Sequence, residues 1–194
     1  MKATWMLLAL GLIYVVASPA LAADMKVDLN IPGVTVTGLQ GKAQAVALWV
    51  EDGRSDPGIG VTLQNDNIVP ARDIAATVMA SFTSALRAAG FRLVPYRADA
   101  PVAILVRIRS LSYTSEKNIL TSTARLSCGM VATLSRGGAM VKERTLGTTG
   151  EYTLTWRPNR KKISELLSST LGDTVQAVLQ DADTVAFLNA GPQQ

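Results

Sequence analysis

The pattern of hydrophobic and polar positions predicts three long β-strands in the second half of the chain. Every second residue from 102 to 108 is branched and apolar, while Arg107 and Arg109 point to the opposite face. The same alternation runs through residues 120–134 and again through residues 140–156. Gly137-Gly138 lies between these last two segments and is a signal for a tight hairpin. We therefore expect a three-stranded antiparallel meander.

The third of these strands carries two cations on its apolar face. Lys142 and Arg144 share the even-numbered positions with Met140 and Leu146. Because a charged side chain is costly to bury, this pattern predicts a β-bulge or an overhanging strand end at the two cations.

Two segments have the spacing of amphipathic helices. In the first, apolar residues recur every three or four positions over residues 74–89. Pro70 suits its first turn, Asp73 places negative charge at its start, and Gly90 is placed to end it as a left-handed cap. The second helix begins after Asn159, its expected N-cap. Its apolar stripe consists of Ile163, Leu166, Leu167, Thr170, Leu171, Val175, Val178 and Ala182.

The remaining segments are shorter. Residues 23–42 read as an extended leader, and residues 43–50 as a strand buried on both faces. Residues 51–58 form a loop rich in turn-forming residues, residues 91–94 a short return strand, and residues 183–188 a short final turn.

The order of these elements predicts an α+β fold. Strands that expose polar residues on one face indicate a half-covered sheet, so both helices should pack on the other face. We expect a two-layer sandwich with a mainly antiparallel sheet and two helices on one face. Residues 43–194 would form this single domain, preceded by the leader (23–42) and a signal peptide (1–22).

The N-terminal segment has the order of a secretory signal. Lys2 precedes an apolar run over residues 5–16, followed by Ser18-Pro19 and by Ala20-Leu21-Ala22. We expect cleavage after Ala22 and a periplasmic protein. The alternative is a retained anchor, but the apolar run is shorter than the about 20 residues that span a bilayer.

Residue usage excludes several classes of chemistry. The chain of 194 residues has no histidine, which excludes Ser-His-Asp and Cys-His catalysis and His-ligated metal sites within it. Cys128 is the only cysteine, so no internal disulfide forms. We expect Cys128 to be a small core residue rather than a nucleophile. No cofactor or metal is predicted.

The charge of the chain is mildly basic. The formal net charge is +4, or +3 without residues 1–22, which hold one lysine and no acid. Outside the cytoplasm, such a surplus suits anionic lipid headgroups, lipopolysaccharide or acidic glycans rather than nucleic acid. No membrane-spanning segment is expected in the chain after cleavage.

Three segments together resemble the YajG family of envelope lipoproteins. They are residues 48–54 (LWVEDGR), the stretch from Ala71-Arg72-Asp73-Ile74 to Ala89-Gly90-Phe91, and the C-terminal stretch with Leu171-Gly172-Asp173-Thr174-Val175, Gln180-Asp181 and Phe187-Leu188. The similarity covers residues 26–188 and rests on order and spacing. It implies a small periplasm-facing protein tethered to the outer membrane, with no established activity and no catalytic residues.

The chain departs from this family at its predicted cleavage site. Family members carry a lipobox cysteine that becomes acylated, whereas this chain has Ala20-Leu21-Ala22-Ala23 there. We therefore expect a soluble periplasmic form without a lipid anchor.

The loop after the first strand is one candidate binding site. Asp52, Arg54 and Asp56 are its main charged residues, next to Glu51. Arg54 could grip a carboxylate or phosphate with its two-pronged guanidinium. Alternatively, Asp52 and Arg54 tie the loop together through a turn and a local ion pair.

The second candidate is the basic cluster before and at the start of the second helix. It consists of Trp156, Arg157, Arg160, Lys161 and Lys162. Cations in the first helical turn oppose the helix dipole, which a bound anion would relieve, and Trp156 suits an interface or a sugar ring. The alternative is a solvated run of charges.

These observations predict a non-catalytic protein of the periplasm that binds an envelope component or a partner protein. An alternative is an enzyme acting on cell-wall glycans with the carboxylates of the 51–56 loop. A third possibility is a structural subunit that assembles through exposed strand edges.

Overall fold

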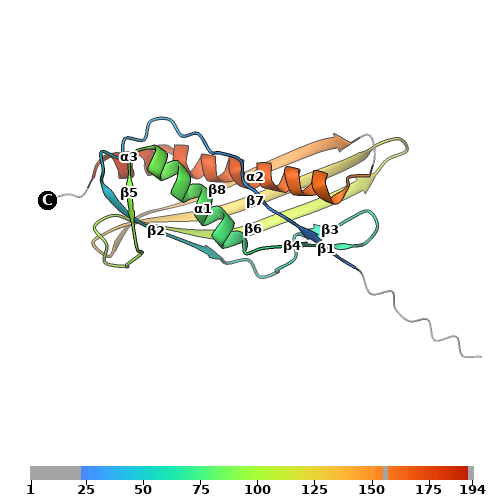
Figure 1. Cartoon of the computed structure of the whole chain (residues 1–194), viewed down its shortest axis with the longest axis horizontal. Helices are drawn as coiled ribbons and strands as arrows, with labels where there is room; N and C mark the ends of the chain where they lie inside the picture. The colour runs from blue at the N-terminus through green and yellow to red at the C-terminus, as the bar shows by residue number, and fades with distance from the viewer. Residues whose placement is uncertain (1–22, 155–156, 192–194) are drawn as a thin grey trace, which may run out of the picture.

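The computed structural model describes residues 23–154 and 157–191. These residues form one mixed β-sheet with three helices on one side of it (Figure 1). In chain order the elements are β1 (Asp24–Val27), β2 (Ala45–Asp52), β3 (Gly60–Val61), β4 (Asn67–Pro70), α1 (Ile74–Ala88), β5 (Arg92–Val94), β6 (Ala103–Lys117), β7 (Ser122–Arg136), β8 (Ala139–Leu154), α2 (Arg160–Gln180) and α3 (Ala182–Asn189). The signal peptide predicted for residues 1–22 lies outside the described residues.

Strands β6, β7 and β8 form the predicted antiparallel meander. β7 pairs with β6 along one side and with β8 along the other. The other edge of β6 is shared by two strands. β2 runs parallel to the first half of β6, with Leu48 opposite Ile104, and β3 pairs with the second half at Gly60 and Tyr113. The sheet therefore forks along β6.

The α+β class is confirmed, and the sheet is mixed: parallel pairs extend the antiparallel meander, so a mainly antiparallel sheet is not confirmed. β2 pairs in parallel with both β5 and β6, and β1 pairs in parallel with β4. α1 lies between β2 and β5 in the chain and carries the chain back to the end of the sheet where β2 began. Strands joined in this way run parallel.

Two bulges reset the face to which the side chains point. In β6 the register shifts between Ile108 and Ser110, so Arg109 is the extra residue. In β8 the register shifts beside Leu134, which leaves Val141 unpaired. The bulge predicted from the cations of this strand is confirmed.

The β8 bulge places its two cations against the junction of α2 and α3. Lys142 Nζ lies 3.0 Å from a carboxylate oxygen of Asp183, and Arg144 Nη2 lies 2.9 Å from Asp181. Asp181 also accepts a hydrogen bond from the backbone N–H of Thr184, which caps α3. Both cations therefore have acidic partners on the helical side of the sheet.

The helix ends largely follow the predicted signals. Asp73 accepts hydrogen bonds from the N–H groups of Ala75 and Ala76, and Gly90 follows α1 with a φ of 88°. Asn159 caps α2 by accepting from Lys162 N. The placement of Pro70 in the first turn of α1 is wrong, because Pro70 is the last residue of β4.

The core lies between the sheet and the helices. α1 buries Ile74, Val78, Phe82, Ala85 and Leu86, and β7 contributes Ala124, Leu126, Cys128, Met130, Ala132 and Leu134. The burial of β2 on both faces is confirmed in part: Val46, Leu48 and Val50 are buried on one face and Ala47 on the other, but Trp49 is 50% exposed. Its ring lies beside that of Tyr96, with the two centroids 6.4 Å apart.

The leader is held against the helices by backbone contacts. Asn30 N–H donates to Ser168 Oγ at 2.9 Å, and Asn189 Nδ2 donates to the carbonyl of Gly38 at 2.7 Å. Ile31 lies against Gly172 of α2. The leader therefore covers the helices on the side away from the sheet (Figure 1). The expected two-layer arrangement thus does not describe the fold completely.

Candidate functional site

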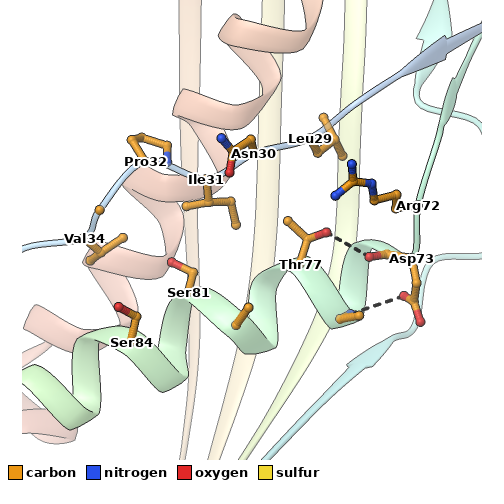
Figure 2. A pocket seen from close by; sticks show the side chains of 13 residues that line it. Leu29, Asn30, Ile31, Pro32, Val34, Arg72, Asp73, Thr77, Ser81 and Ser84 are labelled. Atoms are coloured by element: carbon orange, nitrogen blue, oxygen red, sulfur yellow. Dashed lines mark hydrogen bonds between the residues drawn. The ribbon is translucent and has the colours of Figure 1, made fainter.

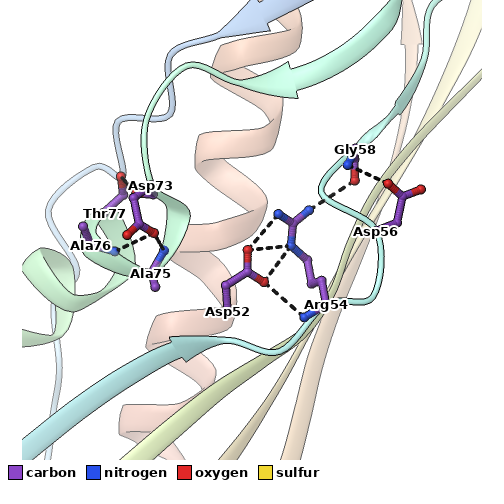
Figure 3. A network of polar contacts seen from close by, with 8 residues as sticks. All are labelled: Asp52, Arg54, Asp56, Gly58, Asp73, Ala75, Ala76 and Thr77. Carbon is purple, nitrogen blue, oxygen red and sulfur yellow. Dashed lines mark hydrogen bonds and ion pairs between the residues drawn. The ribbon is translucent and has the colours of Figure 1, made fainter.

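The 51–58 loop is organised around Arg54, whose side chain is only 5% exposed. Figure 3 shows the guanidinium between the end of β2 and the residues before β3. Arg54 Nε and Nη2 each donate to Asp52 at 2.9 Å, and Nη1 donates to the carbonyl of Gly58 at 3.2 Å. Asp56 accepts from the Gly58 N–H at 2.7 Å. These contacts match the alternative to ligand binding, in which Asp52 and Arg54 hold the loop together through a turn and a local ion pair.

The position of this loop explains why an arginine is buried in it. The loop bridges the fork of the sheet, where β2 leaves β6 and β3 joins it. Gly53 N–H donates to the carbonyl of Ile108, and Tyr113 N–H donates to the carbonyl of Ile59. Gly60 approaches β6 so closely that a Cβ there would lie 1.9 Å from the Tyr113 carbonyl oxygen. Arg54 therefore links the two branches of the fork.

The carboxylates of this loop are engaged in structural contacts. Burial alone would raise the pKa of the Asp52 carboxyl, but the hydrogen bonds and charge of Arg54 outweigh it and hold that pKa below its ordinary value. Glu51 forms an ion pair with Arg107 on the open face of the sheet. A glycoside hydrolase needs an acid whose pKa is raised, and this geometry lowers the pKa of Asp52 instead.

We expect Arg54→Met to lower the free energy of unfolding by about 2 kcal/mol, because it leaves Asp52 and the Gly58 carbonyl without their partner. Removing one member of a buried pair costs more in general, but Asp52 is 32% exposed and water replaces part of the loss. Urea unfolding at pH 7 measures the effect. Arg97→Met is the matched control, since Arg97 grips Asp99 with the same two-residue spacing but is 74% exposed.

The pH dependence of the free energy of unfolding distinguishes a contribution from the ion pair from a contribution of simple packing. The folded pKa of Asp52 lies below its ordinary value of 3.8, so the pair contributes stability above pH 3.8 and loses it as the pH falls through the folded value. The stability difference between the parent and Arg54→Met should therefore shrink in acid. A difference that stays constant down to the folded pKa would show that packing, not charge, is what Arg54 supplies.

A groove runs between the leader and α1 (Figure 2). Its volume is about 450 Å³. α1 lines it with small side chains, among them the hydroxyl-bearing Thr77, Ser81 and Ser84. The leader lines it with larger apolar side chains, which are Leu29, Ile31, Pro32 and Val34. The charged residues at its end are occupied: Arg72 pairs with Asp28 at 3.3 Å, and Asp73 caps α1. No group of three or more acidic or cysteine residues able to hold a metal occurs among the described residues.

The basic cluster has a different character, because most of its charges are unpaired. Arg157, Arg160 and Lys161 are exposed and form no ion pair with any described residue. Lys162 lies 3.7 Å from Glu165 one turn along the helix. Trp156 lies outside the described residues.

Next to this cluster is a feature that the sequence patterns missed. Leu120 was assigned to a strand, but the turn between β6 and β7 exposes Ile119 by 98% and Leu120 by 85%. Arg157 and Leu63 line the same recess as this turn. The only sequence signal was two adjacent branched apolar residues after Lys117-Asn118, which also fits the start of a strand.

Cys128 is a core residue, as predicted. It is buried on β7, and burial raises the pKa of its thiol to about 11, a shift that a hydrogen bond with Thr174 and the nearby charge of Arg54 only partly oppose. A thiol with this pKa is almost wholly protonated at neutral pH and a poor nucleophile.

Comparison with known families shows to which family the chain belongs. Residues 35–189 match the model of a family described as uncharacterized lipoprotein. The chain belongs to this lipoprotein family. The resemblance to YajG-type envelope lipoproteins is thereby confirmed, and the family points to the cell envelope. No curated protein matches the sequence.

Three solved structures are similar to this lipoprotein-family chain at low sequence identity, and the first of them shares its fold. A crystal structure of a Xanthomonas campestris protein is 12% identical with a TM-score of 0.57, and the match covers 84% of this chain and 95% of that one. A minor lipoprotein from Acinetobacter baumannii is 13% identical with a TM-score of 0.48, covering 78% and 98%. Rare lipoprotein B from Shewanella oneidensis is 12% identical with a TM-score of 0.43, covering 72% and 96%. No described helix has the length and apolar character needed to cross a membrane.

Proposed function

We propose that this protein is a non-catalytic component of the cell envelope that binds an anionic envelope component through the start of α2. The observation that carries the proposal is the group of exposed cations Arg157, Arg160 and Lys161, which have no carboxylate partner among the described residues. In the 51–58 loop, by contrast, the arginine is already bound by protein groups. Unpaired cations grouped at one place attract an anionic partner.

Export supports this proposal. The N-terminal pattern predicts transport out of the cytoplasm with cleavage after Ala22, and membership of a lipoprotein family supports a location in the envelope. We propose a periplasmic form without a lipid anchor, because the lipobox cysteine of the family is absent from the predicted cleavage site. Mass spectrometry of the protein purified from envelope fractions tests both points. An N-terminus other than Ala23, or an acyl group, would contradict them.

The test of binding replaces the three unpaired cations. Arg157→Ser, Arg160→Ser and Lys161→Ser are combined in one variant. The fold should be retained, because two of these cations lie at the positive end of the helix dipole. At low salt, we expect the parent to bind vesicles of anionic phospholipid or lipopolysaccharide. Each lost cation should weaken binding by about fivefold, as expected for roughly 1 kcal/mol per charge near an anionic surface.

The matched control removes three charges elsewhere. Lys42, Arg87 and Arg92 are exposed, lie outside this cluster, and form no ion pair with a described residue. Changing these three to serine lowers the net charge equally, so binding that depends on the α2 cluster should survive. Equal loss in both variants would mean that only net charge matters, and absence of binding by the parent at low salt would end the proposal.

A second candidate function is assembly through the free edge of β8. Among the described strands β8 pairs only with β7, and its 16 residues leave a long row of backbone groups without a partner strand. A second copy or a partner strand could pair there. Sedimentation over a range of concentrations tests self-assembly, and a monomer throughout that range would exclude it.

A further inference from the structure

The turn between β6 and β7 exposes two adjacent apolar side chains almost completely. It is closed by a hydrogen bond from Asn118 N–H to the carbonyl of Thr121 at 2.9 Å. Ile119 is 98% exposed and Leu120 is 85% exposed. Single exposed apolar residues are ordinary on proteins, but two neighbouring branched residues at the tip of a hairpin form a continuous apolar point. Nothing in the fold needs them there, because neither packs on the core.

Two cations lie beside this tip. A recess of about 380 Å³ lies beside it, lined by Leu63, Arg157 and the turn itself. Lys117, the last residue of β6, is exposed and forms no ion pair with a described residue. Together with Arg157 and the start of α2, it places positive charge next to the apolar point.

Nearby carboxylates offset part of this charge. Glu116 and Glu151 share Arg125, at 2.8 Å and 3.0 Å, on the open face of the sheet. Asp66 accepts a hydrogen bond from the Thr62 hydroxyl within the turn between β3 and β4 and forms no ion pair with a described residue. Glu165 pairs with Lys162. Lys117, Arg157, Arg160 and Lys161 have no carboxylate partner among the described residues, so unpaired cations remain at the end of the molecule that carries the apolar tip.

The described chain also begins at this end. Asn67 N–H donates to the carbonyl of Ala23, and Asp24 lies opposite Asn67 at the start of β4. Figure 1 shows β1, the β3–β4 turn and the β6–β7 turn at the same end of the elongated molecule.

We propose that this end docks on a bilayer containing anionic phospholipid, with Ile119 and Leu120 inserted below the headgroups. Lys117, Arg157 and the basic start of α2 would then contact the lipid phosphates. This inference rests on the proposed function and names its ligand: a soluble glycan or a polysaccharide offers phosphate or carboxylate but no acyl layer for the tip. Apolar side chains flanked by cations are the combination that holds a protein at a membrane interface.

The first experiment measures binding to vesicles of mixed phosphatidylglycerol and phosphatidylcholine. It uses the chain from Ala23 to Gln194, which contains every described element and the whole core. The variant carries Ile119→Ser and Leu120→Ser, which leave the core untouched. We expect its affinity to fall by roughly tenfold or more, since each side chain loses its transfer out of water. The matched control carries Met140→Ser and Val141→Ser, two side chains exposed by 66% and 55% next to the hairpin at the other end of β7, and should bind as the parent does.

The second experiment reports insertion directly. An environment-sensitive dye is attached to Ile119→Cys, and a separate sample carries it on Met140→Cys. Cys128 is 3% exposed, so labelling is directed to the new thiol. We expect the dye at position 119, but not at position 140, to shift to shorter wavelength on vesicles and to be quenched by brominated acyl chains.

The outcomes separate this inference from the proposed function. If the Ile119/Leu120 variant binds as the parent does while the Arg157/Arg160/Lys161 variant loses binding, insertion is wrong and anion binding stands. The same conclusion follows if the parent binds inositol hexakisphosphate but not vesicles. If the parent binds neither, both proposals are overturned. Loss of binding in both variants, with a quenched dye at position 119, supports insertion.

Discussion

Phe82→Ala is expected to lower the free energy of unfolding by about 3–5 kcal/mol, the usual cost of removing a fully buried phenyl ring. Phe82 is 0% exposed at the middle of α1, within the core formed by that helix, the sheet and α2. The helix is held to the sheet by this apolar stripe rather than by charge. Its truncation therefore leaves a cavity at the point where α1 crosses β2.

Urea unfolding followed by circular dichroism measures this loss, with the slope checked to confirm two-state behaviour. Ser84→Ala is the matched control on the same helix, because Ser84 is exposed and should change stability by less than about 0.5 kcal/mol. A loss below about 1.5 kcal/mol for Phe82→Ala would mean that the core closes around the cavity or that α1 is not docked as described.

Gly41→Ala is expected to cost about 3 kcal/mol or more, through a clash between backbones. Gly41 is buried where the leader crosses the end of α1. A Cβ there would lie 2.3 Å from both the carbonyl carbon of Gly90 and the nitrogen of Phe91. Neither side can move freely, because Gly41 N–H donates to Ala89 at 2.8 Å and Ala43 N–H donates to Gly90 at 2.9 Å.

Gly33→Ala in the same leader is the matched control for this substitution. A Cβ at Gly33 would meet no atom within 4 Å. Alanine there should be neutral or stabilise the fold slightly, because it restricts the unfolded chain. The same unfolding measurement serves both variants. Equal stability of the two would show that the leader does not cross α1 as closely as the structure has it.

Local sequence patterns were sufficient to predict those features in which the environment of a residue depends on its near neighbours in the chain. The alternation over β6, β7 and β8, the Gly137-Gly138 turn and the caps at Asp73 and Asn159 all followed from spacing. The bulge at Val141 was foreseeable because two cations broke an apolar alternation. Their partners, Asp181 and Asp183, could not be identified, since they lie some forty residues away in the chain.

Strand pairing was the main point that local patterns did not resolve. β3 has two residues and β4 has four, which is too short for any alternation to stand out. The parallel pairing of β2 with β5 was open to inference, because a helix joins them and parallel strands need such a crossover. The position of β6 between β2, β3 and β7 depends on contacts far apart in the chain, which periodicity does not report.

The two candidate binding sites also differ in how much of each could be predicted from the sequence. The positive charge of Arg157, Arg160 and Lys161 is a property of the residues themselves, and all three are exposed at the start of a helix that buries Ile163 instead. Arg54 has the same charge, yet the fork of the sheet buries it and Asp52 binds it. Whether an arginine is free for a ligand is thus decided by tertiary contacts, because they set which carboxylates come within reach and how much water remains.

By itself, then, the sequence determined the class of the fold, its long strands and helices, the absence of histidine chemistry, and a basic stretch before the last long helix. Only the tertiary structure decided that the sheet is mixed and forked, that one charged loop is closed by its own ion pairs, and that Ile119 and Leu120 stand exposed beside the basic stretch. The physical reason is range: hydrophobic period and helix capping act between residues a few positions apart, whereas burial and charge pairing depend on segments that only folding brings together.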